Sequence, residues 1–159
     1  MVEVRTGVGS NANANATTTR YAYDALGRRI SKTSERDQQQ NTTTFYWNGD
    51  VLLGEINSNT KPSRTYLFEP FSFKPLALVQ HGQVYHYHTD HIDTPREITN
   101  DRAEVVWSST FKTYGALALA HVNEVDNPLR FQGQYYDEET GLHYNRHRYY
   151  DPNCGQFTT

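Results

Sequence analysis

Runs of β-prone residues that end in tight-turn residues recur along most of this 159-residue chain. In the clearest case, Tyr21 and Tyr23 alternate with smaller side chains and are followed by Asp24 and Gly27. An aspartate at the first position of a turn accepts hydrogen bonds from the backbone ahead of it, and a glycine at the fourth position adopts a positive φ without strain. Residues 20–32 are therefore predicted to form a β-hairpin.

Further turn signals divide the middle of the chain at intervals of roughly ten residues. The pair Asn48-Gly49 separates two β-prone runs, and Asn-Gly is the strongest short signal for a hairpin. Gly82 turns the chain between residues 76–79 and 83–88. Residues 114–120 are expected to form a loop, because the run is too short and too close to glycine for a helix. The whole pattern predicts an all-β fold, an antiparallel meander of hairpins.

Composition supports a sheet that is held together by aromatic side chains. Hydrophobic residues make up only 36% of the chain, and the mean hydropathy is -0.82, so a large aliphatic core is not expected. Aromatic residues nevertheless reach 13%, with 12 tyrosines, which is too many for a disordered chain. Tyrosine packs its ring on a neighbouring strand while its hydroxyl group finds water or a backbone group.

The chain length fits one domain, preceded by a polar segment. Residues 10–19 consist of Ser, Asn, Ala and Thr and show no hydrophobic periodicity. We therefore expect residues 1–19 to form an N-terminal arm or loop and residues 20–159 to form the β-strip. The alternative is that the polar tract is the tip of a hairpin that joins Val2–Val4 to the strand at Arg20.

The last third of the chain is predicted to contain another hairpin. Residues 127–137 and 142–150 are β-prone, and residues 138–141 have the composition of a turn. If residues 142–150 form one strand, its period of two places Tyr144, Arg146, Arg148 and Tyr150 on one face. The spacing then predicts a ladder of stacked arginine and tyrosine side chains.

Charge and cysteine content exclude several classes of protein. With 15 basic and 18 acidic residues the net charge is -3, which gives no basic field for nucleic acid. The single cysteine, Cys154, rules out an internal disulfide. No apolar run is long enough to span a membrane, and the N-terminus lacks the layout of a signal peptide. Secretion by the general route is therefore not expected.

Three histidines form the only cluster that suggests metal chemistry. His86 and His88 fall on one face of a strand, and His91 or Asp90 would complete a zinc site by folding back from the turn. The favoured interpretation is structural: the imidazoles bond to the backbone at a tight turn and pack beside tyrosines. We therefore expect no metal, no cofactor and no catalytic residue.

Two other features have both a chemical and a structural interpretation. Cys154 would need a histidine partner to act as a nucleophile, and it is interpreted as a small turn residue. The arginines at positions 28, 29, 146 and 148 would suit phosphate groups, but acidic residues outnumber basic ones, so pairing within the chain is expected.

The order of the motifs resembles the Rhs/YD-repeat family, including the Tc-toxin C proteins. The segment from Tyr21 to Arg28 looks like a YD repeat, Tyr85–Glu97 resembles the Rhs segment Y-H-x-D-H-L-G-T-P-R-E, and Asn127–Pro152 resembles the signature near the C-terminal end of the Rhs core. The family has glycine where Asp93 stands. The structural signature comprises Tyr21, Tyr23, Asp24, Gly27, Arg28, Asp90, Pro95, Arg96, Phe131, Gly133, Tyr135, Tyr136, Asp137, Gly141, Tyr144, Arg148, Tyr149, Tyr150, Asp151 and Pro152.

The resemblance implies a segment of shell wall from a polymorphic toxin system. In that family a long β-strip spirals into a hollow shell that encloses a toxin polypeptide, and a self-cleaving aspartyl-protease motif follows the stretch matched by Asp151-Pro152. The chain ends at Thr159, before that motif, so no protease aspartate is assigned. The expected partners are other Rhs segments, a toxin polypeptide or a second copy of the chain. The resemblance also implies a location in the cytoplasm of the producing bacterium, with a specialised secretion system as the route of any export. The alternative is a carbohydrate-binding or adhesive module that stacks sugars on exposed tyrosines.

Overall fold

The computed structural model describes residues 2–6, 17–58 and 63–158, and these residues form strands and turns without a helix. An 11-stranded sheet contains β1 to β11 in sequence order, and a 4-stranded sheet contains β12 to β15. Every pair of neighbouring strands is antiparallel. The predicted all-β antiparallel meander is therefore confirmed.

The strand bounds follow the predicted hairpin rhythm. The large sheet contains β1 (Val2–Thr6), β2 (Thr17–Tyr23), β3 (Arg29–Arg36), β4 (Gln39–Asn48), β5 (Val51–Asn57), β6 (Arg64–Phe68), β7 (Pro75–Gln80), β8 (Gln83–Thr89), β9 (Pro95–Thr99), β10 (Val105–Phe111) and β11 (Leu117–Asn123). The small sheet contains β12 (Tyr135–Asp137), β13 (Leu142–Asn145), β14 (Arg148–Asp151) and β15 (Gln156–Thr158).

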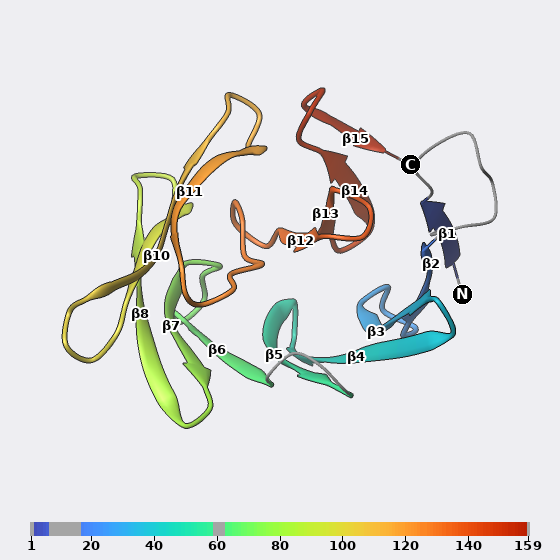
Figure 1. The fold of residues 1–159 in the computed structure, drawn as a ribbon, viewed down its shortest axis with the longest axis horizontal. Helices are drawn as coiled ribbons and strands as arrows, with labels where there is room; N and C mark the ends of the chain where they lie inside the picture. Colours follow the sequence, from blue (N-terminus) through green and yellow to red (C-terminus); the bar gives the residue numbers. More distant parts are fainter. Residues whose placement is uncertain (1, 7–16, 59–62, 159) are drawn as a thin grey trace.

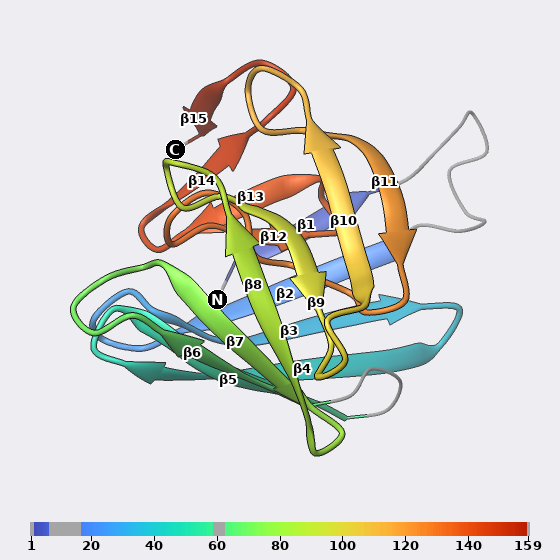
Figure 2. The same cartoon turned by 90° about the vertical axis from the view of Figure 1, so that its left-hand side faces the viewer.

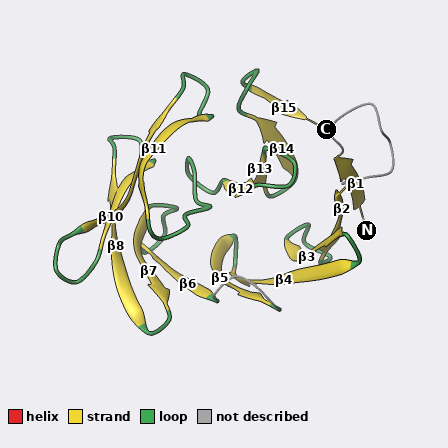
Figure 3. Cartoon of the chain, viewed as in Figure 1, coloured by secondary structure: helices red, strands yellow, loops and turns green. Residues whose placement is uncertain are grey.

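The large sheet curls into an open ring around the last part of the chain (Figure 1). After β11 the chain crosses the concave side of this sheet, and the small sheet then lies beside β1 and β2, so that both ends of the chain are on the same side of the molecule. Short loops join most of the described strands, whereas residues 124–134 form a longer connection between β11 and β12 (Figure 3). A view from the side shows β12 to β14 lying across the inner face of the large sheet (Figure 2). The chain's own C-terminal segment thus occupies part of the ring.

Aromatic side chains form much of the core between the sheet and this segment. Rings from the two parts meet directly: Phe45 and Tyr135 lie 5.4 Å apart edge to face, and Trp47 and Tyr144 lie 6.2 Å apart. Such pairs stabilise a fold by about 0.5–1.5 kcal/mol beyond the burial of their surface. The buried cluster comprises Phe45, Leu52, Tyr66, Leu78, Tyr85, Tyr87, Ile98, Val106, Trp107, Val125, Leu129, Tyr135 and Tyr144.

One turn recurs at several of the hairpin ends. At Asp24, Asp90 and Asn100 the side-chain oxygen accepts the backbone N–H groups two and four residues ahead, at 2.9–3.1 Å. The fourth residue of each turn, Gly27, Asp93 or Ala103, has a positive φ. The predicted turn at residues 24–27 is confirmed, and the same geometry is built twice more on residues other than glycine.

The other predicted hairpins are present, with one shift of register. His81 and Gly82 form the two-residue loop between β7 and β8, both at positive φ. Asn48 pairs with Val51, so the loop after β4 consists of Gly49 and Asp50 and not of the Asn-Gly pair itself.

Two local predictions in the second half of the chain were wrong. Residues 142–150 do not form one strand: Arg146, at a positive φ, and His147 turn the chain, and Tyr144 then pairs with Tyr149 across a hairpin. This turn breaks the period of two, so the arginine and tyrosine ladder does not form. The expected loop over residues 114–120 gives way to β11 from Leu117, because this run completes its backbone hydrogen bonds on the edge of β10.

The N-terminal part pairs with the sheet. β1 pairs with β2 from Val2 opposite Tyr21 to Thr6 opposite Thr17, so residues 2–6 and 17–19, which were expected in an arm, belong to strands. The β-branched threonines at positions 17, 18 and 19 favour this extended backbone. This is the hairpin arrangement that the sequence left open, and the connecting tract, 7–16, lies outside the described residues.

Candidate functional site

The inner face of the ring contains two clusters of buried charge, and the first is centred on Arg29. The side chains of Arg29 and Asp137 are both fully buried and form an ion pair between β3 and β12. The guanidinium carbon lies 4.4–5.3 Å from four aromatic ring centres, those of Tyr21, Phe45, Tyr135 and Tyr144. Burial alone would lower the pKa of Arg29, but the Asp137 carboxylate outweighs that effect, and the pKa is raised.

Lys32 and Glu139 extend this first cluster toward the solvent. The Lys32 Nζ atom donates to Glu139 Oε2 at 2.9 Å and to Asp137 Oδ1 at 3.4 Å. Ser34 Oγ donates to the other oxygen of Glu139 at 3.3 Å. The pKa of Glu139 is lowered, because the attraction of Lys32 and these hydrogen bonds outweigh the effect of burial. Residues that follow β12 are thereby bonded to β3.

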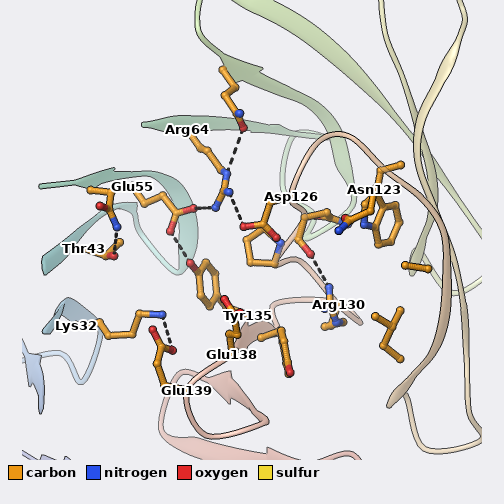
Figure 4. Close-up of a pocket in the computed structure, with 18 of the residues that line it drawn as sticks. Lys32, Thr43, Glu55, Arg64, Asn123, Asp126, Arg130, Tyr135, Glu138 and Glu139 are labelled. Atoms are coloured by element: carbon orange, nitrogen blue, oxygen red, sulfur yellow. Dashed lines mark hydrogen bonds and ion pairs between the residues drawn. The ribbon is translucent and has the colours of Figure 1, made fainter. Parts of the chain in front are cut away.

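The second cluster surrounds Glu55 on β5 (Figure 4). Arg64 donates from Nη1 to Glu55 Oε1 at 2.6 Å and from Nη2 to Asp126 Oδ2 at 2.7 Å. Tyr66 donates to Glu55 Oε1 at 2.9 Å, and Tyr135 donates to Glu55 Oε2 at 2.5 Å. Both oxygens of the buried carboxylate are therefore satisfied, and burial raises the pKa of both tyrosines well above its ordinary range.

A cavity of about 650 Å³ lies between the two clusters, lined by residues of both. Five carboxylates and three lysine or arginine side chains line it, together with amides and backbone from residues 123–128. Figure 4 shows the labelled charged side chains of these clusters around this space, with Glu55 and Arg64 on one side and Lys32 and Glu139 below. Buried charge of this kind fixes how the segments pack more than it adds to stability.

The signature residues from the two ends of the chain lie against each other. The rings of Tyr21 and Tyr149 are 5.9 Å apart, and the hydroxyl groups of Tyr23 and Tyr149 are 2.7 Å apart. The Tyr144 hydroxyl accepts the Arg29 N–H at 2.9 Å and donates to the Gly27 carbonyl at 3.4 Å. The motifs that carry the resemblance thus form one contact, which we call the seam: residues 21–29 against 137–149.

The remaining signature residues build turns or cover rings. Asp24, Asp90 and Asp151 accept backbone N–H groups in turns, and Gly133 and Gly141 have positive φ. Arg28 forms an ion pair with Asp24 at 2.7 Å.

The other signature side chains contact aromatic rings. The guanidinium groups of Arg96 and Arg148 lie over the rings of Phe111 and Phe157. Tyr136 packs edge to face on His143. Tyr150 donates to the Tyr114 carbonyl. Pro95 and Pro152 are buried, whereas Phe131 is exposed.

The structure does not bring the candidate metal ligands together. His86 and His91 are exposed, and His88 bonds to Thr99 Oγ1 at 2.9 Å. Within residues 2–6, 17–58 and 63–158, no group of three or more histidine, cysteine, aspartate or glutamate side chains is placed to hold a metal ion. Cys154 is a free, exposed thiol in the turn between β14 and β15. The same described ranges contain no helix that would cross a membrane.

The arginine pairs and the tyrosines also have structural partners. Arg28, Arg29 and Arg146 pair with Asp24, Asp137 and Asp50, as expected. The expectation was wrong for Arg148, which forms no ion pair with the described residues and lies over the ring of Phe157. Of the 12 tyrosines only Tyr46 and Tyr114 are exposed, so the extended tyrosine face that sugar stacking would need is absent from the described surface.

Sequence reasoning did not select the Glu55 cluster. Apolar residues of a strand are usually buried and charged residues exposed, but β5 has the opposite arrangement. Its Leu53 and Ile56 are exposed, and its Glu55 is buried. Arg64 lies on the same face of β6 as the buried Tyr66. It is therefore the one residue of the Glu55 cluster whose burial the alternation of side chains along a strand could have predicted. Asp126 lies 62 residues beyond Arg64, so nothing local connects them.

Comparison with known proteins identifies relatives for almost the whole chain. A family model described as Teneurin YD-shell matches residues 8–159. The double-stranded DNA deaminase toxin A of Burkholderia cenocepacia is 33% identical over 167 residues, and the toxin protein Tse5 of Pseudomonas aeruginosa is 33% identical over 173 residues. The matches cover 87% and 88% of this chain but only 12% and 13% of those two proteins.

Solved structures share the fold at lower identity. The Photorhabdus luminescens Tc holotoxin pore matches with a TM-score of 0.73 and 19% identity, over 98% of this chain and 8% of that chain. The crystal structure of TcdB2-TccC3-TEV matches with a TM-score of 0.71 and 18% identity, again over 98% of this chain and 8% of the other.

Proposed function

The chain belongs to the Rhs/YD-repeat family, matching its Teneurin YD-shell model, and on that premise we propose that it is a non-catalytic segment of shell wall that encloses or shields a toxin polypeptide. The observation that carries this proposal is the curled meander of 11 strands, which the buried Asp137 ties to its own C-terminal segment through Arg29 and Lys32. A curved, continuous sheet can form part of the wall of a shell, and this role requires no catalytic residues.

The charged groups at the inner face support a structural role. The Glu55 carboxylate is held by Arg64 and two tyrosine hydroxyls, and Asp137 is held by Arg29 and Lys32. A general acid or base needs a proton site that a substrate can reach. These carboxylates instead satisfy the chain's own donors.

The edge of the large sheet gives the wall a means of joining other segments. β11 ends the sheet, and its residues are exposed apart from the half-buried Val122. A strand at a sheet edge presents unpaired backbone groups that another strand can complete. The run Leu117–Ala120 has no charge to oppose such pairing. The partner would be a strand of another YD-repeat segment.

The test is assembly with a YD-repeat fragment. The probe, called the YD-repeat fragment, is the P. aeruginosa relative without the stretch that matches this chain. The readout is molar mass from light scattering during size-exclusion chromatography. We expect a stoichiometric complex that the edge variant A118K/A120K weakens. The control T65K/L67K adds the same charge at exposed positions of the interior strand β6 and should assemble normally. A folded chain that forms no complex would contradict the proposal.

A further inference from the structure

A second cleft, of about 450 Å³, lies where the turn after β10 meets β14 and β15, and it shares Arg130 with the charged cavity. Tyr150 bonds to the carbonyl of Tyr114 there, and both views place the β10–β11 loop beside the last strands (Figures 1 and 2). Aromatic rings make much of its wall, contributed by Phe111, Tyr114, Phe131, Tyr150 and Phe157. We call this site the aromatic cleft.

Cations without an acidic partner gather at the aromatic cleft. In the part of the chain for which side chains are described, five lysine or arginine residues have no ion pair: Arg96, Arg102, Lys112, Arg130 and Arg148. Three of these line the cleft, and Arg148 lies 3.9 Å from the ring centre of Phe157, which also lines it. Most lysine and arginine side chains elsewhere in the described part of the chain form ion pairs with acidic side chains. The unpaired cations at the aromatic cleft therefore favour the binding of an anion there.

Arg130 is the most unusual of these cations. It is 7% exposed, yet its Nη1 atom donates only to the carbonyl groups of Asn127 and Leu129, and its Nε atom has no hydrogen-bond partner. Burial lowers the pKa of Arg130 to about 10. Asp126 acts on this guanidinium from a distance and offsets only part of the effect of burial, and no carboxylate forms an ion pair with it. A buried guanidinium without such a pair is costly unless something else supplies the negative charge.

The geometry joins the cationic and aromatic parts of the cleft. Arg96 and Arg130 both lie over the ring of Phe111, at 5.5 and 5.8 Å, so their guanidinium groups flank one ring. The single carboxylate in the lining, Asp90, already accepts the N–H groups of Ile92 and Thr94. Phe131 and Phe157 are 43% and 42% exposed, which leaves ring surface for a ligand.

We propose that the aromatic cleft binds a polypeptide segment in which acidic and aromatic side chains alternate. A carboxylate would sit among Arg96, Lys112 and Arg130, and an aromatic ring would stack on Phe131 or Phe157. The net charge of -3 opposes a nucleic acid, whose phosphates extend well beyond one cleft. This inference rests on the proposed function, because the segment would come from the polypeptide that the shell encloses.

The test is fluorescence anisotropy with dye-labelled peptides on the purified chain. The probe has the sequence Gly-Ser-Asp-Phe-Glu-Phe-Ser-Gly, and its comparator carries Asn and Gln in place of Asp and Glu. We expect the acidic peptide to bind about tenfold more tightly than the amide peptide, with an affinity that falls as salt rises. Equal binding of the two peptides, or tighter binding of a dye-labelled oligothymidylate, would overturn the proposal.

Matched variants locate the binding. R96Q/K112Q removes two cations of the cleft and is expected to weaken the acidic peptide about tenfold. R36Q/R102Q removes the same charge at exposed positions outside the cleft lining and should leave binding unchanged. Phe131→Ala should also weaken binding of the acidic peptide. Phe71→Ala, which removes another exposed ring outside the cleft lining, should not. Equal losses in target and control variants would mean general charge attraction and would refute the site.

The result is separable from that of the assembly experiment. If the chain assembles with the YD-repeat fragment but ignores the acidic peptide, the aromatic cleft proposal fails and the shell proposal stands. If the peptide binds but no assembly occurs, the shell proposal fails. The cleft is then a binding site for acidic, aromatic segments, but their assignment to an enclosed polypeptide fails with the shell.

Discussion

The hydroxyl groups of Tyr23 and Tyr149, 126 residues apart in the sequence, lie 2.7 Å from each other. They join the start of the curled sheet to its closing segment, next to the stacked rings of Tyr21 and Tyr149. The seam thus depends on hydroxyl pairing as well as on ring packing.

Removing either hydroxyl should therefore weaken the fold modestly. Tyr23→Phe and Tyr149→Phe are each expected to lower the free energy of unfolding by about 0.5–1.5 kcal/mol, and the double variant by less than the sum. Urea unfolding of the four proteins measures this coupling. Tyr46→Phe, at an exposed ring without a hydrogen bond among the described residues, serves as the control and should change little. Strict additivity of the two seam variants would show that the hydroxyl pair contributes nothing.

Neutralising Asp137 should be far more damaging. Asp137→Asn leaves the fully buried Arg29 without its counter-charge, which costs about 3–5 kcal/mol for a buried pair. Thermal and urea unfolding measure the loss. The exposed pair of Arg20 and Glu35 gives the matched control, because Glu35→Gln should cost less than about 1 kcal/mol. Similar losses from the two substitutions would contradict the role assigned to the buried pair.

Relieving a strained turn should stabilise the chain. Ala103 has a φ of 61° and an exposed side chain, so Ala103→Gly removes a steric cost without removing a buried contact. We expect a gain of about 0.5–1 kcal/mol in the free energy of unfolding, net of the extra flexibility of glycine in the unfolded chain. Ala118→Gly, in the exposed strand β11, is the control and should destabilise. A loss at position 103 as large as that at 118 would refute the strain argument.

Acid should destabilise the fold through His143. Burial, with the nearby Arg130, lowers the pKa of His143 to about 4. The unfolded histidine takes up a proton near its ordinary pKa of 6.5, so stability is complete above that pH and is lost as the pH falls toward 4. The urea concentration at the midpoint of unfolding should fall less steeply with decreasing pH in His143→Gln than in the wild type. The control His86→Gln, at an exposed position, should show the same dependence on pH as the wild type. Identical slopes in all three would be the contrary result.

Turn chemistry explains why much of the fold was predictable. Asp24 with Gly27, and Gly82 between its two strands, act through bonds within a few residues, so the sequence displays them. The hairpin at Arg146 escaped prediction because arginine does not signal a positive φ, and the β-prone residues at both ends of the run masked the turn signal of Asn145. β11 escaped because its exposed, alanine-rich residues become a strand through pairing with β10.

The charged interior was the least predictable part. Glu55 and Asp137 find partners 9 and 108 residues away, and those distances are set by the curl of the whole sheet. A register shift in the β4–β5 ladder between Tyr46 and Trp47 interrupts the strict alternation, so the faces cannot be read from spacing alone.

The order of the strands has a consequence for how the chain folds. Each neighbour in β1 to β11 is also the next strand in sequence, so the large sheet can grow hairpin by hairpin as the chain leaves the ribosome. The seam forms later, because Arg29 pairs with Asp137, which lies 108 residues further along the chain. Contacts that close so long a loop form slowly. Until then the Arg29 guanidinium lacks both this carboxylate and the rings of Tyr135 and Tyr144. Synthesis that stops before β12 should therefore leave a sheet that cannot close, and such a product would be exposed to proteases.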